Sequence, residues 1–219
     1  MNRVFISVEG QTEETFVREI LSKHLWNFNV DTIPIIISTK IMKQGNKFKG
    51  GLSSYDKVRN EIQKLLKDTN VVAVTTMHDL YKLPTDFPGY FTKPCFNGFM
   101  KADHLEKSFQ NEISNPRFKP YLQIHEFEAI LFVCPAITAR TLSNIKKQKK
   151  LEEIKERYHS PEEINDGDNT APSKRIMQLF PNYEKPLGGS LIAIGVGLDN
   201  IRAECPHFNE WLTWLEGLG

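Results

Sequence analysis

Carboxylate side chains follow three separate apolar segments of the chain, each near the point where the segment ends. They are Glu9 after residues 3–8, Asp79 after residues 71–77, and Glu126 with Glu128 after residues 118–124. The carboxyl ends of neighbouring parallel strands lie at one edge of a sheet, which is where open α/β proteins bind ligands. If the three segments are such strands, these acids meet at one site.

An oxygen-rich site of this kind suits a hard divalent cation, because Mg²⁺ prefers carboxylate oxygens and keeps several waters. Such a cation neutralises phosphate charge and activates a bound water. We therefore expect Glu9, Asp79 and Glu126 to bind Mg²⁺ or Mn²⁺, and these three acids together with Glu128 to be the catalytic residues. Glu126 and Glu128 are two positions apart, so on a helix only one of them would reach the site. The alternative is that Glu9 is a solvated loop carboxylate.

Strands and helices that alternate along the chain must position these acids. We expect strands at residues 3–8, 33–37, 71–77 and 118–124, and helices at residues 13–26, 54–66 and 100–113. Gly10 permits a tight turn after the first strand, Thr12 is the expected N-cap, and Glu13 favours the first helical turn. The alternation predicts an α/β fold with a mostly parallel sheet flanked by helices and a helical C-terminal part.

The expected organisation is a single domain over residues 1–219, with an α/β core at 1–135 and a mainly helical extension at 136–219. Pro34 lacks a backbone N–H and therefore places its strand at a sheet edge, unless it stands at the start of that strand. Residues 39–51 are basic and rich in glycine, which predicts a mobile loop. Residues 83–98 contain several prolines and glycines, which predicts a shaped loop beside Asp79.

Composition narrows the class of protein without naming a function. The chain has 219 residues, 40% of them hydrophobic and 25% charged, and a formal net charge of +1, so any affinity for nucleic acid must come from a local patch or a bound cation. It has no apolar run of about 18 residues and no signal-peptide pattern, so we expect no membrane association and a cytoplasmic location. The cysteines, Cys95, Cys134 and Cys205, have neither disulfide-framework nor zinc-ligand spacing, and we interpret them as reduced thiols.

A second set of residues suits phosphate binding. Lys174 and Arg175 follow a turn-forming segment, and Thr170 or Ser173 is the expected cap of the helix that begins near Lys174. A helix N-terminus beside two cations binds phosphate well. Arg202 and, with weaker support, Lys185 are further candidates. The alternative is an ordinary capping loop with solvated basic residues.

Several motifs in one order resemble those of a known family, over nearly the whole chain. They are Val8-Glu9-Gly10-Gln11-Thr12-Glu13, Asp79-Leu80-Tyr81 with Leu83-Pro84 and Pro88-Gly89, residues 123–132 around His125-Glu126-Phe127-Glu128, residues 161–167, 171–176 and 183–185, and Cys205-Pro206-His207-Phe208-Asn209 with Trp211-Leu212. The family that these motifs resemble is the domain of unknown function 4276, or DUF4276.

The resemblance implies a Toprim-like fold, related to the catalytic module of topoisomerases, primases and overcoming-lysogenization-defect nucleases. In Toprim proteins a glutamate after the first strand and an Asp-x-Asp after a later strand hold Mg²⁺. Glu9 matches the glutamate and Asp79 the first aspartate, whereas Tyr81 stands at the second aspartate. Glu126 or Glu128 would have to supply the missing ligand. Members of the family are often encoded beside ATPases in bacterial defence loci.

Together these observations predict a magnesium-dependent nuclease or phosphodiesterase that acts on nucleic acid, as part of a bacterial anti-phage defence system and with an AAA- or ABC-type ATPase partner. The alternative is a non-catalytic binding or regulatory subunit of an ATPase complex that keeps a degenerate Toprim-like scaffold, which Tyr81 favours. A small-molecule phosphohydrolase would use the same acids. The sequence leaves the oligomeric state and the choice between DNA and RNA open.

Overall fold

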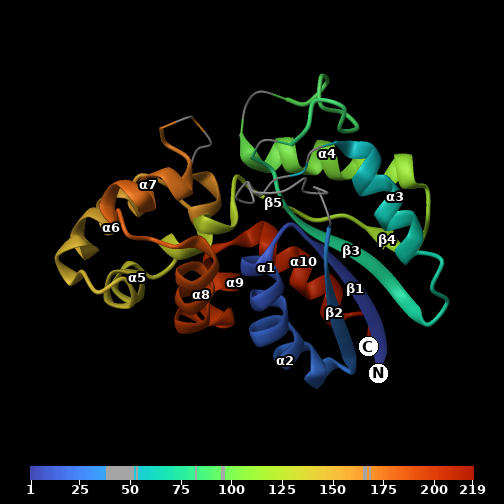
Figure 1. Ribbon diagram of the computed structural model, residues 1–219, viewed down its shortest axis with the longest axis horizontal. Coiled ribbons are helices and arrows are strands. Elements are labelled where there is room, and N and C mark those ends of the chain that lie inside the picture. The colour runs from blue at the N-terminus through green and yellow to red at the C-terminus, as the bar shows by residue number, and fades with distance from the viewer. Residues whose placement is uncertain (38–51, 53, 82, 95–96, 165–166, 168) are drawn as a thin grey trace, which may run out of the picture.

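The computed structural model describes residues 1–37, 52, 54–81, 83–94, 97–164, 167 and 169–219. The predicted loop at residues 39–51 and Cys95 lie outside the described residues. A five-stranded sheet forms the centre of the molecule (Figure 1). Its strands are β1 (Asn2–Val8), β2 (Val30–Ile36), β3 (Val71–Asp79), β4 (Phe118–Lys119) and β5 (Leu122–Gln123).

The strand order is β2-β1-β3-β4, with β5 also paired to β3, and each of these pairings is parallel. The predicted parallel sheet is therefore confirmed. β2 is an edge strand, which explains why it tolerates Pro34. In the register Val8 lies opposite Met77, so the residues after β1 and the end of β3 come to the same edge.

The predicted strand at 118–124 is divided into two short strands, because Pro120 has no N–H to donate to the sheet. Side-chain hydrogen bonds span the gap. The Thr76 hydroxyl donates to the Tyr121 carbonyl at 2.8 Å and accepts from the Tyr121 N–H at 2.9 Å. β5 can therefore continue along β3 and reach Asp79, whose Cα partner is Gln123.

The first predicted helix forms as a continuous helical run: α1 (Gln11–Phe16), the π-helical turn η1 (Val17–Leu21), α2 (Ser22–Leu25) and the 3-10 turn η2 (Trp26–Phe28). Its N-cap is Gly10, and Thr12 is buried inside the first turn, so the predicted Thr12 cap is wrong. The other predicted helices are α3 (Tyr55–Leu65) and α4 (Gly98–Ile113).

In the described part of the chain, the residues after β5 are helical or irregular. The helical elements are η3 (Phe127–Phe132), α5 (Pro135–Thr141), η4 (Ile145–Lys147), α6 (Gln148–Lys155), η5 (Pro161–Glu163), α7 (Pro172–Leu179), the π-helical turn η6 (Lys185–Gly189), α8 (Ser190–Val196), α9 (Leu198–Glu204) and α10 (Pro206–Glu216). None of the described helices has the length and apolar character needed to cross a membrane.

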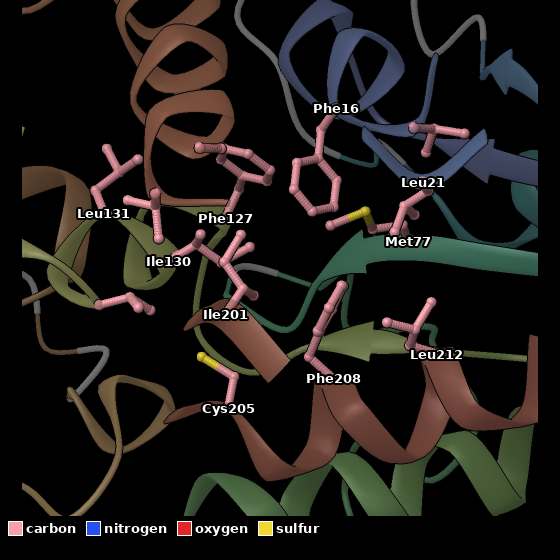
Figure 2. Packing of buried hydrophobic residues seen from close by; sticks show 14 of the residues in the cluster. Phe16, Leu21, Met77, Phe127, Ile130, Leu131, Ile201, Cys205, Phe208 and Leu212 are labelled. Atoms are coloured by element: carbon pink, nitrogen blue, oxygen red, sulfur yellow. The ribbon is translucent and has the colours of Figure 1, made fainter. Parts of the chain in front are cut away.

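Two apolar clusters lie on opposite faces of the sheet. One includes buried residues of α3 and α4, and the other joins β1 and α1 to η3, α8, α9 and α10. Figure 2 shows Phe16, Phe127 and Phe208 converging in the second cluster. The Phe16 ring meets the Phe127 ring edge-on at 5.4 Å and the Phe208 ring at 5.9 Å. This packing fixes η3, which carries Glu128, against the end of α1.

Of the cysteines that the structure describes, Cys134 and Cys205 are free thiols, and Cys205 is fully buried. Burial raises the pKa of the Cys205 thiol, so this side chain is neutral and acts as a small apolar residue in the core.

Candidate active site

The parallel sheet brings Glu9 and Asp79 together where β1 and β3 end. The backbone N–H of Asp79 donates a hydrogen bond of 2.8 Å to Glu9 Oε1. Asp79 in turn accepts from the Phe127 N–H at 2.9 Å through Oδ1, which joins the end of β3 to η3. Two acids from neighbouring strands and the start of η3 are therefore linked by direct hydrogen bonds.

Glu128 and Lys185 complete this group of charges. The Glu128 side chain on η3 is fully buried, and the Lys185 ammonium lies 3.0 Å from its Oε2 and 3.6 Å from Asp79 Oδ2. The Tyr183 hydroxyl donates to Glu128 Oε1 at 3.5 Å. Glu128, rather than Glu126, is thus the η3 acid that shares a cation with Asp79.

Glu13 is a buried acid of the same site, with only 4% of its surface exposed. Lys185 lowers its pKa and Glu128 raises it, so the three charges interact, and burial makes the net change an increase. From the sequence, Glu13 was predicted only to favour the first helical turn. One signal was available, because Glu13 precedes Phe16 and Val17 by three and four positions and therefore lies on the apolar stripe of its helix.

A close approach between helices places Lys185. Gly189 ends η6, and a Cβ at this position would lie 3.0 Å from both Thr12 Cγ2 on α1 and the Tyr183 hydroxyl. A side chain at this position would press on both neighbours, so glycine favours the close packing of η6 against α1. Lys185, at the beginning of η6, consequently reaches the carboxylates while 40% of its side chain stays exposed.

Burial raises the pKa values of Asp79, Glu128 and Glu9. It raises the pKa of Asp79 to about 7, an increase that Lys185 opposes and Glu13 and Glu126 reinforce. Burial likewise raises the pKa of Glu128 to about 7, again against the effect of Lys185. Burial and the adjacent Asp79 raise the pKa of Glu9 well above its ordinary value.

The pKa of Lys185 is raised well above its ordinary value. Burial opposes this rise, but the surrounding carboxylates Asp79, Glu128 and Glu13 outweigh it. The ammonium is therefore charged at neutral pH. We call Glu9, Glu13, Asp79, Glu128 and Lys185 the acidic cluster. Lys185 forms ion pairs with Asp79 and Glu128, and the pKa values of these two acids lie near neutrality.

The acidic cluster has the donor chemistry of a magnesium or manganese site, since its carboxylate oxygens are the ligands that hard cations prefer. Its carboxylate side chains are nevertheless not close enough to one another to form a preformed set of metal ligands. Within the described residues, no three His, Cys, Asp or Glu side chains are grouped closely enough to hold a metal ion. The Lys185 ammonium supplies the compensating charge between Asp79 and Glu128.

Glu126 binds a helix terminus instead of joining the ion pairs of Lys185. Its Oε2 accepts from the Ser173 N–H at 2.9 Å and its Oε1 from the Ser173 hydroxyl at 3.0 Å. Glu126 therefore occupies the N-terminus of α7, which the sequence predicted to bind phosphate. The predicted caps are also wrong, because the N-cap of α7 is Ala171 and a carboxylate distant in sequence satisfies the backbone.

The predicted phosphate-binding arginines make contacts within the fold. Arg175 Nε donates to the Thr170 carbonyl at 2.7 Å. Arg202 on α9 lies 2.7 Å from Glu216 on α10 and does not join the acidic cluster through any of its described hydrogen bonds or ion pairs. Lys174 is half-buried on α7. Lys185, the weaker candidate, is the basic residue that the structure places among the acids.

The histidines next to the predicted acids have backbone and packing roles. His78 is fully buried, its Nε2 lies 3.0 Å from the Ser7 hydroxyl, and burial lowers its pKa to about 3, so it is neutral. His125 adopts a left-handed backbone with φ of 62°, and its carbonyl accepts from the Tyr81 N–H at 2.8 Å. Tyr81 thus stands beside the site, two residues beyond Asp79.

The model of one protein family, the domain of unknown function DUF4276, matches residues 8–216. The chain belongs to the DUF4276 family. The matched range includes each residue of the acidic cluster. A search of curated proteins found no match.

Among solved structures, this DUF4276 chain is similar to the C-terminal region of the OLD protein of Xanthomonas campestris pv. campestris. Two structures of that region are each 14% identical to this chain, with a TM-score of 0.43. The first comparison covers 97% of this chain and 95% of the other chain. The second comparison covers 98% of this chain and 97% of the other chain. A third structure is 13% identical, with a TM-score of 0.42 and 98% of both chains covered. This likeness is too distant to transfer a site.

Proposed function

We propose that the acidic cluster is the active site of a metal-dependent phosphodiesterase that cleaves nucleic acid. The observation that carries this proposal is the convergence of Glu9, Glu13, Asp79 and Glu128 around one ammonium at the end of a parallel sheet. Buried acids with raised pKa values are costly to a fold and gather at functional sites. The family resemblance to Toprim proteins supports the same reading of Glu9 and Asp79.

In this proposal Glu9 and Asp79 hold Mg²⁺ or Mn²⁺, with Glu13 and Glu128 completing the oxygen-rich set. The bound cation would neutralise phosphate charge and lower the pKa of a coordinated water. Glu128, with a pKa of about 7, is suited to accept a proton from the attacking water at neutral pH, while Asp79 stays ionised beside the cation. Lys185 is charged and partly exposed, which suits it to bind a phosphate oxygen of the substrate.

The second candidate function is a non-catalytic binding or regulatory module. It is favoured by Tyr81, which replaces an acid, and by the ion pairs of Lys185, which compensate the carboxylates without a metal. The two functions differ in metal binding. A catalytic site takes up Mn²⁺ at millimolar concentration and releases protons as Asp79 and Glu128 ionise, whereas the binding module gives no heat of metal binding in calorimetry.

Cleavage of plasmid and single-stranded DNA and RNA with Mg²⁺ or Mn²⁺ tests the proposal directly. We expect cleavage by the unmodified chain and a loss of at least a hundredfold in Glu9→Gln and Asp79→Asn. Glu153→Gln, which removes an exposed carboxylate on α6, is the matched control and keeps full activity. Undiminished cleavage by a folded Glu9→Gln variant would contradict the proposal. Cleavage of free nucleotides alone would indicate a small-molecule phosphohydrolase.

The family resemblance also motivates the proposal of an ATPase partner in a bacterial defence system. Affinity purification of the tagged chain from its native host, followed by mass spectrometry, tests this. Recovery of an ATPase that restores or stimulates cleavage supports the partner, and recovery of the chain alone counts against it.

A further inference from the structure

A conspicuous aromatic side chain stands on the loop between β3 and α4. Phe91 has 85% of its surface exposed, more than any other large apolar side chain that the structure describes. Leaving a phenylalanine in water forfeits the stabilisation that burial would provide. Such a ring is a candidate binding residue if the loop holds it in solvent and prevents it from packing onto the protein surface.

Successive turns hold this loop in shape. The N–H of Phe87 donates to Pro84, that of Tyr90 to Phe87 and that of Thr92 to Gly89, at 3.0, 3.0 and 3.1 Å. The Phe87 ring is buried and packs edge-on against Tyr55 and Phe109 at 5.5 and 5.1 Å. The base of the loop is therefore anchored in the core between α3 and α4.

The tip of the loop is fixed against α4. Gly89 has φ of 77°, and a Cβ there would lie 2.9 Å from His104 Nε2, so only glycine permits this backbone and this approach. The Thr92 hydroxyl lies 3.0 Å from the same His104 nitrogen. Phe91 lies between these two anchored residues and is held outwards by the backbone.

A cation and a second ring support Phe91. The Lys93 ammonium lies 3.2 Å from the centroid of the Tyr90 ring and donates to the Tyr90 carbonyl at 2.7 Å. The Tyr90 ring meets the Phe91 ring edge-on at 5.4 Å. The loop thus presents an exposed ring next to a positive charge, a combination that proteins use to bind unpaired nucleic acid.

The loop that carries Phe91 follows Tyr81 and precedes Gly98, and both of these residues lie at the edge of the sheet that carries the acidic cluster (Figure 1). The Tyr81 N–H bonds to the His125 carbonyl, and a Cβ on Gly98 would lie 3.2 Å from His125 Nε2. His104, against which the loop tip packs, follows Gly98 by about 9 Å along α4. The loop that carries Phe91 and the acidic cluster therefore both start from the edge of the sheet at which β3 ends.

We propose that Phe91 stacks on an unpaired base and that the substrate of this protein is single-stranded nucleic acid. The inference rests on the proposed phosphodiesterase function for its substrate class. The face of a base is accessible to a side chain only where the base has left its stack, so a stacking residue selects unpaired strands over duplex. Lys93 adds attraction for the backbone phosphates.

Fluorescence anisotropy with a labelled single strand and its matched duplex tests the inference, in low salt and with EDTA so that cleavage plays no part. We expect tighter binding of the single strand, and a loss of about fivefold or more in affinity in Phe91→Ala. Phe91→Trp should restore the affinity. Trp26→Ala is the matched control, because it removes another exposed aromatic ring, 56% exposed, beside the opposite end of the sheet.

A strand with abasic positions separates stacking from charge. The unmodified chain should bind it more weakly than the intact strand, whereas Phe91→Ala should bind both alike. The inference would be overturned by equal affinity for the single strand and the duplex, or by no binding to either. It would also be overturned by a Phe91→Ala variant with full affinity, which is the result expected if the ring binds a protein partner instead.

The outcomes for the two proposals are distinguishable. Metal-dependent cleavage without any effect of Phe91 on binding would remove this inference alone. Phe91-dependent binding of single strands without metal-dependent cleavage would remove the phosphodiesterase and leave a single-strand-binding module.

Discussion

Replacing Glu128 by glutamine should make the folded protein more stable at alkaline pH while abolishing the proposed catalysis. The ionised carboxylate is destabilising, because its pKa of about 7 in the folded protein exceeds its ordinary value of 4.5. At about 1.4 kcal/mol per pH unit, this difference corresponds to about 3 kcal/mol. This cost already includes the attraction of Lys185, and glutamine stays neutral at every pH, so we expect a net gain of about 1–3 kcal/mol.

The sign of the pH dependence follows from the raised pKa. The stabilisation that the protonated Glu128 provides is complete below about pH 4.5 and is lost as the pH rises towards 7. The advantage of glutamine should therefore be small near pH 5 and greatest at pH 8. Its amide can satisfy both neighbours, since the oxygen can accept from Lys185 and the nitrogen can donate to Tyr183.

Urea unfolding without divalent metal, at pH 5 and pH 8, measures the effect through the free energy of unfolding of both proteins. Glu153→Gln serves as the control for removal of an exposed carboxylate and should change the free energy of unfolding by less than about 0.5 kcal/mol at either pH. A Glu128→Gln variant that is less stable at pH 8 than the unmodified chain would refute the reasoning. It would mean that the ion pair with Lys185 outweighs the cost of burying the carboxylate.

Two further substitutions test residues outside the acidic cluster. Glu126→Ala removes both hydrogen bonds to Ser173, so we expect a loss of about 1–2 kcal/mol in the free energy of unfolding, and an unchanged value would argue against a capping role. Arg202→Met removes the ion pair with Glu216, so it should lower thermal stability while leaving the affinity for oligonucleotides within about twofold; a marked fall in affinity would restore Arg202 as a phosphate-binding residue.

Much of the sheet could be predicted from the sequence because the signals that define it are local. Residues 3–8 and 71–77 are short, apolar and β-branched, and both form parallel strands of the central sheet. Parallel strands place their carboxyl ends at one edge, and this geometry alone brings Glu9 and Asp79 together. The prediction was less accurate at 118–124, where Pro120 divides one expected strand into two.

The charges of the site were harder to assign, because each depends on contacts between distant parts of the chain. Glu126 and Glu128 have similar neighbours in sequence, yet Glu126 binds Ser173, 47 positions away, while Glu128 binds Lys185. Their separation of two positions predicted that the two side chains point in different directions. It did not predict which of them would face Asp79. Glu13 resembled an ordinary residue of a first helical turn until the fold buried it.

By itself, the sequence determined the parallel sheet, the meeting of Glu9 with Asp79, and membership of the DUF4276 family. These follow from patterns within a few residues and from motifs kept in one order. Only the tertiary structure decided that Lys185 is the counter-ion of the acids and that Phe91 is held in solvent. Both depend on close packing at a glycine, of η6 on α1 and of the loop on α4, which no local pattern encodes.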